Sequence, residues 1–283
     1  MQEKLFDAIC GLLEASRGDL SVQTYRTYYF VLTKFDAFCP GLECHSLTEK
    51  VILKFKEYMR ELGNCENTIL KTLACLKILI NKLIAVGKLE ANPFARIRIG
   101  KIHSNRKYLT VEELRWLYTS FIAQHSHLSR PEFDAMQAFL FSCYTGLRYS
   151  DLKSLTSAEV KDGAIRKRMH KTGDSVYVPL TSQAQTLIGL AGHSKDGKVL
   201  RVTENTYFNR HLRAAATKLG FTKHLHCHLA RHTFATTCLT LGIPLEVTSK
   251  LLGHRNVSTT MIYAKYVDKV LDAEMEKFRE LDK

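Results

Sequence analysis

The stretch HLARHTFATTCLTLGIPLEVTSKLLGHRNVSTTMIY, residues 228–263, decides how the second half of this 283-residue chain is organised. Its apolar pattern indicates a helix, a break at Gly242-Ile243-Pro244, a second helix over residues 245–252 and a further turn. Ser258 is placed to cap a short last helix that presents Tyr263. The stretch therefore predicts a helical frame that holds polar side chains at fixed positions.

The residues before this stretch predict further helices and one small sheet. Thr110 followed three residues later by Glu113 is typical of a capping box. Residues 133–143 are apolar nearly all round, as in a buried helix. An Asp162-Gly163 turn followed by alternating residues predicts an antiparallel hairpin. We therefore expect residues 108–283 to form a mainly α domain with a small antiparallel β-sheet, of the α+β class.

The first part of the chain predicts helices only. Apolar residues recur at three-to-four spacing over residues 51–62 and 69–84, and an earlier helix covers residues 22–38. Gly87 stops the pattern. We expect an all-α domain over residues 1–90.

Between the two domains we expect a basic linker over residues 91–107. From Gly87 to Lys107 the chain has six basic residues and one acid, and Asn92-Pro93 breaks the helix. This charge favours contact with phosphates, with a merely solvated linker as the alternative. The candidate DNA-binding residues are Arg96, Arg98, Lys101, Arg106 and Lys107.

The composition is that of a globular chain with a strong positive charge. Apolar residues make up 45% and charged residues 24%, which excludes wholesale disorder. There are 41 Lys and Arg against 28 Asp and Glu, a net charge of +13, shared as +6 over residues 1–107 and +7 over residues 108–283. Such a charge favours a polyanionic partner, most often nucleic acid, that contacts both halves.

Cysteine usage and hydropathy indicate the compartment. Eight cysteines, none in a Cys-x-x-Cys pair, are too few for a disulfide scaffold and indicate a reduced protein. The first ten residues carry charges where a signal peptide has an apolar core. The most apolar helix, over residues 69–85, is interrupted by three lysines. We therefore expect no membrane segment and a cytoplasmic location at the nucleoid.

Several common kinds of site have no counterpart in the sequence. There is no GxxxxGKS or GxxxxGKT phosphate loop, no GxGxxG loop and no acidic cluster at two-metal spacing. His224, His226 and His228 alternate beside Cys227, but no second ligand cluster follows at zinc-finger spacing. We expect no metal and no cofactor.

The polar residues that cluster in the second half are basic, and they suit a phosphodiester. Charge builds on the equatorial oxygens of a transferring phosphoryl group, and Arg binds two such oxygens without losing its proton. Lys or His can protonate a leaving oxygen, and the 12 tyrosines supply candidate nucleophiles. The basic candidates are Arg148, Lys171, His228, Arg231, His232 and His254.

Four separated motifs then occur in a fixed order: TGLRYSDL at 145–152, KTG at 171–173, HLARHTFAT at 228–236 and LGHRNVSTTMIY at 252–263. Together they closely resemble the tyrosine recombinase, or phage-type integrase, family. The first domain resembles the family's helical SAM-like core-binding domain in size, helicity and placement. One departure is Ala230, where many members have Leu, and it leaves the His-to-Arg spacing intact.

The resemblance implies which residues bind the scissile phosphate. Arg148 and Arg231 would hold its non-bridging oxygens, and His254 would bond the same phosphate. Asp151 stands where the family keeps an acid and would orient Arg148 or its neighbours.

The resemblance also implies which residues form and break bonds. Tyr263, nine residues after His254, would attack phosphorus and form a 3′-phosphotyrosyl link. Lys171, at the tip of the hairpin, would protonate the leaving 5′ oxygen, and His228 would assist proton transfer around the nucleophile. His232 is expected to pack or to bond structurally.

The resemblance thus implies a site-specific recombinase that cuts and rejoins double-stranded DNA and so integrates, excises or inverts it. Its implied partners are the DNA sites, three further copies in a synaptic tetramer, and accessory DNA-bending or directionality proteins. The tail, residues 268–283, has an apolar helical face that either closes its own core or docks on a neighbouring protomer.

Two alternatives stay open. The break at 242–244 between two helices resembles a helix-turn-helix, which favours a DNA-binding regulator without catalysis. A type IB topoisomerase shares the chemistry of the recombinases but relaxes DNA as a monomer.

Overall fold

The computed structural model describes residues 3–100, 107–191 and 196–264. The chain divides into two compact units, Met1–Asn105 and Arg106–Lys283. The tail over residues 268–283 and two of the expected linker contacts, Lys101 and Arg106, lie outside the described residues.

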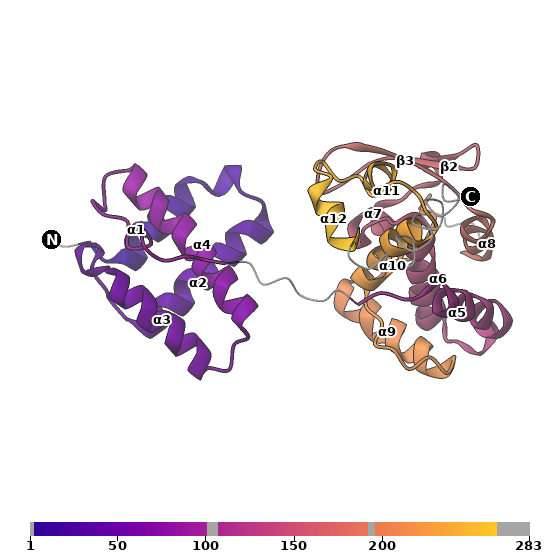
Figure 1. Ribbon diagram of the computed structural model, residues 1–283, viewed down its shortest axis with the longest axis horizontal. Coiled ribbons are helices and arrows are strands. Elements are labelled where there is room, and N and C mark those ends of the chain that lie inside the picture. Colours follow the sequence, from indigo (N-terminus) through magenta and orange to yellow (C-terminus); the bar gives the residue numbers. More distant parts are fainter. Residues whose placement is uncertain (1–2, 101–106, 192–195, 265–283) are drawn as a thin grey trace, which may run out of the picture. The chain divides into compact units, whose positions relative to one another are not determined.

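In its described residues the first unit consists of four α-helices and short connections (Figure 1). They are α1 (Leu5–Ala15), α2 (Val22–Phe38), α3 (Glu49–Glu61) and α4 (Glu66–Ala85). The longest, α4, contacts each of the other three and buries a stripe of apolar residues against them. Helix α2 begins at Ser21, whose side-chain oxygen accepts a hydrogen bond of 3.1 Å from the Thr24 amide. The expected all-α organisation of this part is therefore observed.

Aromatic rings fill the centre of the first unit. The rings of Phe35 on α2 and Phe55 on α3 meet edge to face, with centroids 4.9 Å apart. Phe38 and Tyr58 extend the same cluster, and their ring centroids lie 5.1 Å apart. These contacts fix α3 against α2.

The segment after α4 packs more tightly than a linker. Leu89 and Phe94 are buried in the core of the first unit, and Ile97 and Ile99 pack against it. The expected linker over residues 91–107 therefore does not begin at residue 91, because the apolar side chains as far as Ile99 fill the core of the first unit. Arg96 and Arg98, which alternate with Ile97 and Ile99, remain exposed.

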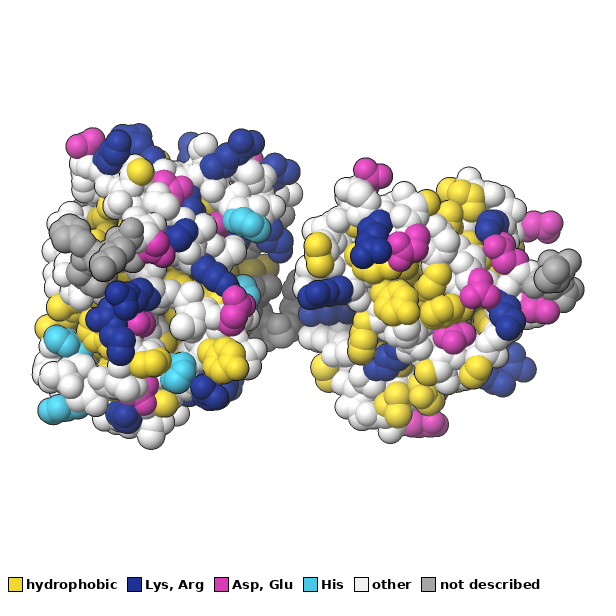
Figure 2. Space-filling view, turned by 180° about the vertical axis from the view of Figure 1, so that it is seen from behind, with side chains coloured by type: hydrophobic (Ala, Val, Ile, Leu, Met, Phe, Trp, Pro, Cys, Tyr) yellow, Lys and Arg dark blue, Asp and Glu magenta, His cyan; other side chains and the backbone are white. Residues whose placement is uncertain are grey.

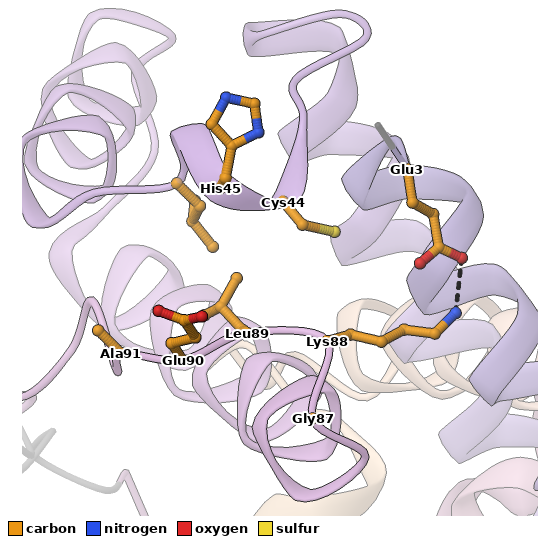
Figure 3. Close-up of a pocket in the computed structure, with 9 residues that line it drawn as sticks. Glu3, Cys44, His45, Gly87, Lys88, Leu89, Glu90 and Ala91 are labelled. Carbon is orange, nitrogen blue, oxygen red and sulfur yellow. Dashed lines mark hydrogen bonds and ion pairs between the residues drawn. The ribbon is translucent and has the colours of Figure 1, made fainter. Parts of the chain in front are cut away.

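The start of the same segment lines a cavity of about 470 Å³ (Figure 3). Lys88 lies across it and pairs with Glu3, with Nζ 2.5 Å from the carboxylate oxygen. Cys44 and His45 face the same cavity from the short helical turn Cys44–Ser46. One of the six basic residues counted between Gly87 and Lys107 thus has an acidic partner within its own unit.

The second unit packs its helices around α6 (Figure 1). Helix α6 contacts α8, α9 and α10 and is buried nearly all round, as its sequence predicts. Thr110 caps α5 in the predicted box, with the Glu113 amide 3.2 Å from Thr110 Oγ1 and the Thr110 amide 2.8 Å from the Glu113 carboxylate. The helices are α5 (Val111–Gln124), α6 (Arg130–Thr145), α7 (Tyr149–Ser154), α8 (Ser182–Ala191), α9 (Asn205–Lys218), α10 (Cys227–Thr240), α11 (Leu245–Leu251) and α12 (Ser258–Ala264).

A three-stranded antiparallel sheet covers one side of this helical core. Its strands are β1 (Val160–Lys161), β2 (Ala164–Arg168) and β3 (Ser175–Pro179), in the order β1-β2-β3. Ile165 pairs with Val178, and both are buried. The predicted turn at Asp162-Gly163 has positive φ at both residues, 51° and 69°. The predicted fold class, mainly α with a small antiparallel sheet, is confirmed.

The surface of both units carries many Lys and Arg side chains (Figure 2). No helix within residues 3–100, 107–191 or 196–264 combines the length and apolar composition needed to cross a membrane.

Candidate active site

The first motif places Arg148 where α6 ends. Gly146 terminates α6 with φ 68°, and a Cβ there would lie 2.5 Å from a ring carbon of Phe234 on α10. Only glycine satisfies both the left-handed backbone and this close approach. The chain then turns directly into α7, with Arg148 at its N-cap and Asp151 in its first turn.

Arg231 links three of the motifs. Its side chain on α10 is only 6% exposed. Nη1 donates to the Gly146 carbonyl and Nη2 to the Leu252 carbonyl, both at 2.6 Å. The end of α6 and the segment before His254 are therefore joined through one guanidinium group.

The charge of Arg231 has no carboxylate within ion-pairing distance in the described part of the chain. Burial and the neighbouring Arg148 lower the pKa of Arg231 to about 9, and the negative charges of Tyr263 and Asp151 oppose this change. The group remains cationic at neutral pH. A buried cation of this kind gains from an added anion, because its electric field is poorly screened.

The Arg148 guanidinium group lies beside the Gly253 carbonyl and has a buried N–H donor that no described residue accepts. Its Nη2 donates to the Gly253 carbonyl at 3.4 Å. Its Nη1 is buried, has no hydrogen-bond partner among the described residues, and lies 4.0 Å from the Asp151 carboxylate. A buried unsatisfied donor is costly and needs an explanation, and a phosphate oxygen would satisfy it.

Asp151 connects Arg148 to the turn that carries Lys171. The Asp151 side chain is fully buried, and Oδ1 accepts a hydrogen bond of 2.8 Å from the His170 amide. Its Oδ2 is the oxygen near Arg148. The carboxylate therefore fixes the backbone immediately before Lys171 and faces the guanidinium at the same time.

Lys171 lies exposed in the turn between β2 and β3, as predicted from the motif. Arg255 holds this turn through two contacts: its Nε lies 2.9 Å from the Asp174 carboxylate, and its Nη2 donates to the Thr172 carbonyl. The hydrogen bond from Arg255 is the main cause that lowers the pKa of Asp174. The residue after His254 thus anchors the turn that carries Lys171.

His254 and Tyr263 belong to the last motif. His254 Nδ1 lies 2.7 Å from the hydroxyl of the buried Thr260, and the His254 amide donates to the Ser249 carbonyl at 3.0 Å. Tyr263, three residues after Thr260 on α12, is only 3% exposed. Its side chain packs in the small core formed by α10, α11 and α12.

His228 begins the third motif at the exposed first turn of α10. The amide of its neighbour, Cys227, donates to Asn209 Oδ1 at 2.9 Å, so α9 fixes where α10 starts. His228, Arg231 and His232 lie at helix spacings of three and four and therefore share one face of α10.

Sequence reasoning missed two contributors to this site and left the partner of a third unnamed. His232 lies with Nδ1 2.7 Å from the Tyr263 hydroxyl, a contact that agrees with the expected structural bond but whose partner was not predicted. Arg255 and Asn209 were not singled out at all. The one signal for His232 is its helix spacing from His228; the partners of Arg255 and Asn209 are distant in sequence and leave no signal.

Taken together, α10 presents a buried guanidinium group between the end of α6 and the segment before α12, with a second arginine, imidazoles and a buried tyrosine close by. Arginines, which bind anions well, beside a tyrosine, which can act as a nucleophile, are the residue types expected in the class of enzymes that act on a phosphodiester.

Comparison with known proteins places the chain within that class. A model of the phage integrase family matches residues 107–269, and a model of the phage integrase SAM-like domain matches residues 4–102. The chain belongs to the phage integrase family. It is a tyrosine-type site-specific recombinase, as the four motifs predicted.

Individual relatives are similar to this chain, in sequence or in fold, over most of its length. The tyrosine recombinase XerD of Shewanella oneidensis is 27% identical over 281 residues, which cover 92% of this chain and 91% of the relative. A lambda integrase dimer bound to a COC′ core site has the same fold at 18% identity, with a TM-score of 0.74 over 93% of this chain and 77% of its own. A lambda integrase tetramer bound to a Holliday junction is 19% identical and has a TM-score of 0.71, over 92% of this chain and 77% of its own.

Proposed function

We propose that the residues gathered around Arg231 form the catalytic centre of this recombinase. The observation that carries the proposal is the pair of hydrogen bonds from Arg231 to the Gly146 and Leu252 carbonyls. Through them one buried cation gathers the motifs that contain Arg148, His254 and the candidate nucleophile. Such a cluster offers positive charge where a phosphate would bind.

In this centre Arg148 and Arg231 bind the non-bridging oxygens of the scissile phosphate, and His254 bonds the same group. The buried Nη1 of Arg148, to which no described residue offers a hydrogen-bond acceptor, supplies a donor for it. Because both arginines are already held by backbone carbonyls, binding requires little rearrangement. Asp151 supports this geometry from the side of α7.

The reaction is a transesterification. The Tyr263 oxygen bonds to phosphorus while the bond from phosphorus to the 5′ oxygen breaks, which leaves a 3′-phosphotyrosyl link. Lys171 donates a proton to the departing 5′ oxygen, and His228 assists proton transfer around the nucleophile. A free 5′ hydroxyl reverses the step, because the link conserves the energy of the phosphodiester.

Residues outside the centre hold the DNA. Arg96, Arg98 and Lys107 are exposed and contact phosphates near the boundary between the two units, together with Lys101 and Arg106. Each such contact adds to the salt dependence of binding. Arg96 and Arg98 act from the surface of the first unit, since Ile97 and Ile99 anchor this segment to its core.

The assembled form is a tetramer on two synapsed DNA sites, in which four cleavages exchange strands. A lambda integrase tetramer bound to a Holliday junction is a structural precedent for this arrangement. The outcome is integration, excision or inversion, and accessory DNA-bending or directionality proteins are further partners. The cytoplasmic, nucleoid-associated location stays a prediction.

A nicked DNA substrate tests the assignment, because loss of the short 5′ fragment prevents religation and traps the covalent adduct. We expect wild-type protein to form the adduct on its own site and Tyr263→Phe to bind that site without forming it. Tyr144→Phe and Tyr266→Phe are matched controls and should still trap DNA. An adduct with Tyr263→Phe would overturn the assignment of the nucleophile.

Adduct trapping tests the first alternative, and relaxation of a supercoiled plasmid tests the second. A regulator without catalysis would bind DNA and give no adduct with any site. A type IB topoisomerase would relax an arbitrary supercoiled plasmid, whereas the recombinase should act only on plasmids that carry its site.

A further inference from the structure

The hydroxyl of Tyr263 has an imidazole partner to which the proposed function assigns no chemical step. His232 Nδ1 lies 2.7 Å from the Tyr263 oxygen, and the two rings lie with their centroids 5.6 Å apart at an angle of 49°. The accepting atom of a general base must lie within about 2.6–3.2 Å of the heavy atom whose proton it removes. His232 meets this requirement.

The contact is made between two fixed elements. His232 follows Arg231 on α10, and Arg231 is held at both ends by backbone carbonyls. Tyr263 lies on α12, which Thr260 ties to the His254 ring at 2.7 Å. Because both partners are anchored, their approach is determined by the fold.

The surroundings also suit removal of the phenolic proton. Tyr263 is 3% exposed, so water has little access to its hydroxyl. The cation of Arg231 stabilises a negative charge on Tyr263, and the same attraction raises the pKa of Arg231 against the effect of burial. His228, by contrast, lies at the exposed start of α10, one helical turn away from His232.

We propose that His232 is the general base that activates Tyr263. When neutral, with its ring proton on Nε2, it accepts the phenolic proton at Nδ1. The Tyr263 O–H bond breaks, an N–H bond forms on His232, and the oxygen bonds to phosphorus as the 5′ oxygen leaves with the proton from Lys171. On rejoining, His232 returns the proton to Tyr263. This step rests on the proposed role of Tyr263.

The test is single-turnover cleavage of the nicked substrate by His232→Asn. The Asn carbonyl oxygen occupies roughly the place of Nδ1 and still accepts the phenolic hydrogen bond, but it does not take the proton. We expect cleavage to slow about 10²-fold to 10³-fold. His232→Gln provides a second side chain that cannot act as a base.

A more acidic phenol provides the readout that a structural role would not change. Replacing Tyr263 with a fluorinated tyrosine makes the cleavage rate depend less on a general base. The factor by which His232→Asn slows cleavage should therefore shrink about tenfold or more. Lys171→Ala is the matched control, because Lys171 acts on the leaving oxygen, and it should lose the same factor with either phenol. The unfolding midpoint of both variants and the site affinity of His232→Asn should stay near those of the wild type.

The outcomes distinguish this inference from the assignment of the nucleophile. If Tyr263→Phe abolishes the adduct while His232→Asn and His232→Gln cleave at the wild-type rate, only the role of His232 is overturned. If the fluorinated phenol restored the cleavage rate of His228→Asn and not that of His232→Asn, the general base would be His228, and the role of His232 would again be overturned. An adduct with Tyr263→Phe would overturn both.

Discussion

The guanidinium group of Arg231 is buried and donates hydrogen bonds to backbone carbonyls, whereas the turn that carries Lys171 is exposed and is held by Arg255 at its edge. Arg231 bonds the Gly146 and Leu252 carbonyls, so it is part of the packing between α6, α10 and α11. Lys171 contributes nothing comparable to the core.

The difference follows from the two chemical tasks. A guanidinium group keeps its charge at neutral pH even where burial lowers its pKa to about 9, as at Arg231, so the fold can bury and fix it before DNA arrives. A proton donor must reach a leaving oxygen that belongs to the DNA, and an exposed turn allows that reach. Under the proposed roles, phosphate binding is built into the core of the second unit, and proton donation is placed at its surface.

The largest effect is expected from Arg231→Lys. A single ammonium group cannot span from the Gly146 carbonyl to the Leu252 carbonyl and also bind two phosphate oxygens. Single-turnover cleavage should fall by about 10³-fold. Arg166→Lys is the control, because Arg166 lies exposed on β2 over the Tyr177 ring, and it should cleave at nearly the wild-type rate. A fall in the cleavage rate of less than tenfold for Arg231→Lys would contradict phosphate binding by the buried Arg231.

A smaller and chemically different loss is expected from Lys171→Ala. Without a proton donor, cleavage should slow by about 10²-fold. Sulfur in place of the bridging 5′ oxygen should restore most of the rate, because a thiolate leaves without being protonated. Arg231→Lys should gain nothing from the same substrate. Equal behaviour of the two variants would remove the distinction between a phosphate pocket and a proton-donating turn.

The sequence predicts the parts of this site that depend on local pattern. Helix periodicity and turn residues place Arg148 after α6 and Lys171 in the β2–β3 turn, and both positions are observed. Order and spacing of the motifs single out Arg231 and Tyr263. The burial of α6 also follows directly from its uninterrupted apolar residues.

The rest depends on contacts between distant residues. Arg255 meets Asp174 across 81 positions, and His232 meets Tyr263 across 31, so no local pattern records either contact. The segment after α4 was assigned to a linker because it has no helical period. In the structure its apolar residues fill the core of the first unit in an irregular conformation.

A loss of only a few fold is expected from Arg255→Gln, which removes the ion pair to Asp174 and loosens the turn of Lys171. Exposed ion pairs contribute little, so cleavage should fall about threefold to fivefold. Asp174→Asn should cause the same loss, and the double variant no more than either single one. The sulfur-substituted DNA should restore all three variants, since the turn acts through Lys171. An additive double variant would assign Arg255 another role.

The smallest effect on cleavage is expected at the opposite end of α6, where Glu132→Gln changes stability instead. The Glu132 carboxylate accepts the Ser129 amide at 2.8 Å and pairs with Lys218 at 2.7 Å. Burial raises its pKa, but these bonds outweigh burial and lower it to about 2. Because the carboxylate is more acidic in the folded chain, its stabilisation of about 2 kcal/mol is complete above pH 4.5 and is lost as the pH falls toward 2.

Thermal unfolding at several pH values measures this contribution. Wild-type protein should be more stable than Glu132→Gln at pH 7, and the two should converge toward pH 2, where Glu132 is protonated as well. Cleavage at neutral pH should be the same for both proteins, because the Ser129 bond remains and the pocket lies at the other end of the helix. If Glu132→Gln lost cleavage as strongly as Arg231→Lys, general stability would explain both losses, and the contrast between buried pocket and exposed turn would lose its chemical basis.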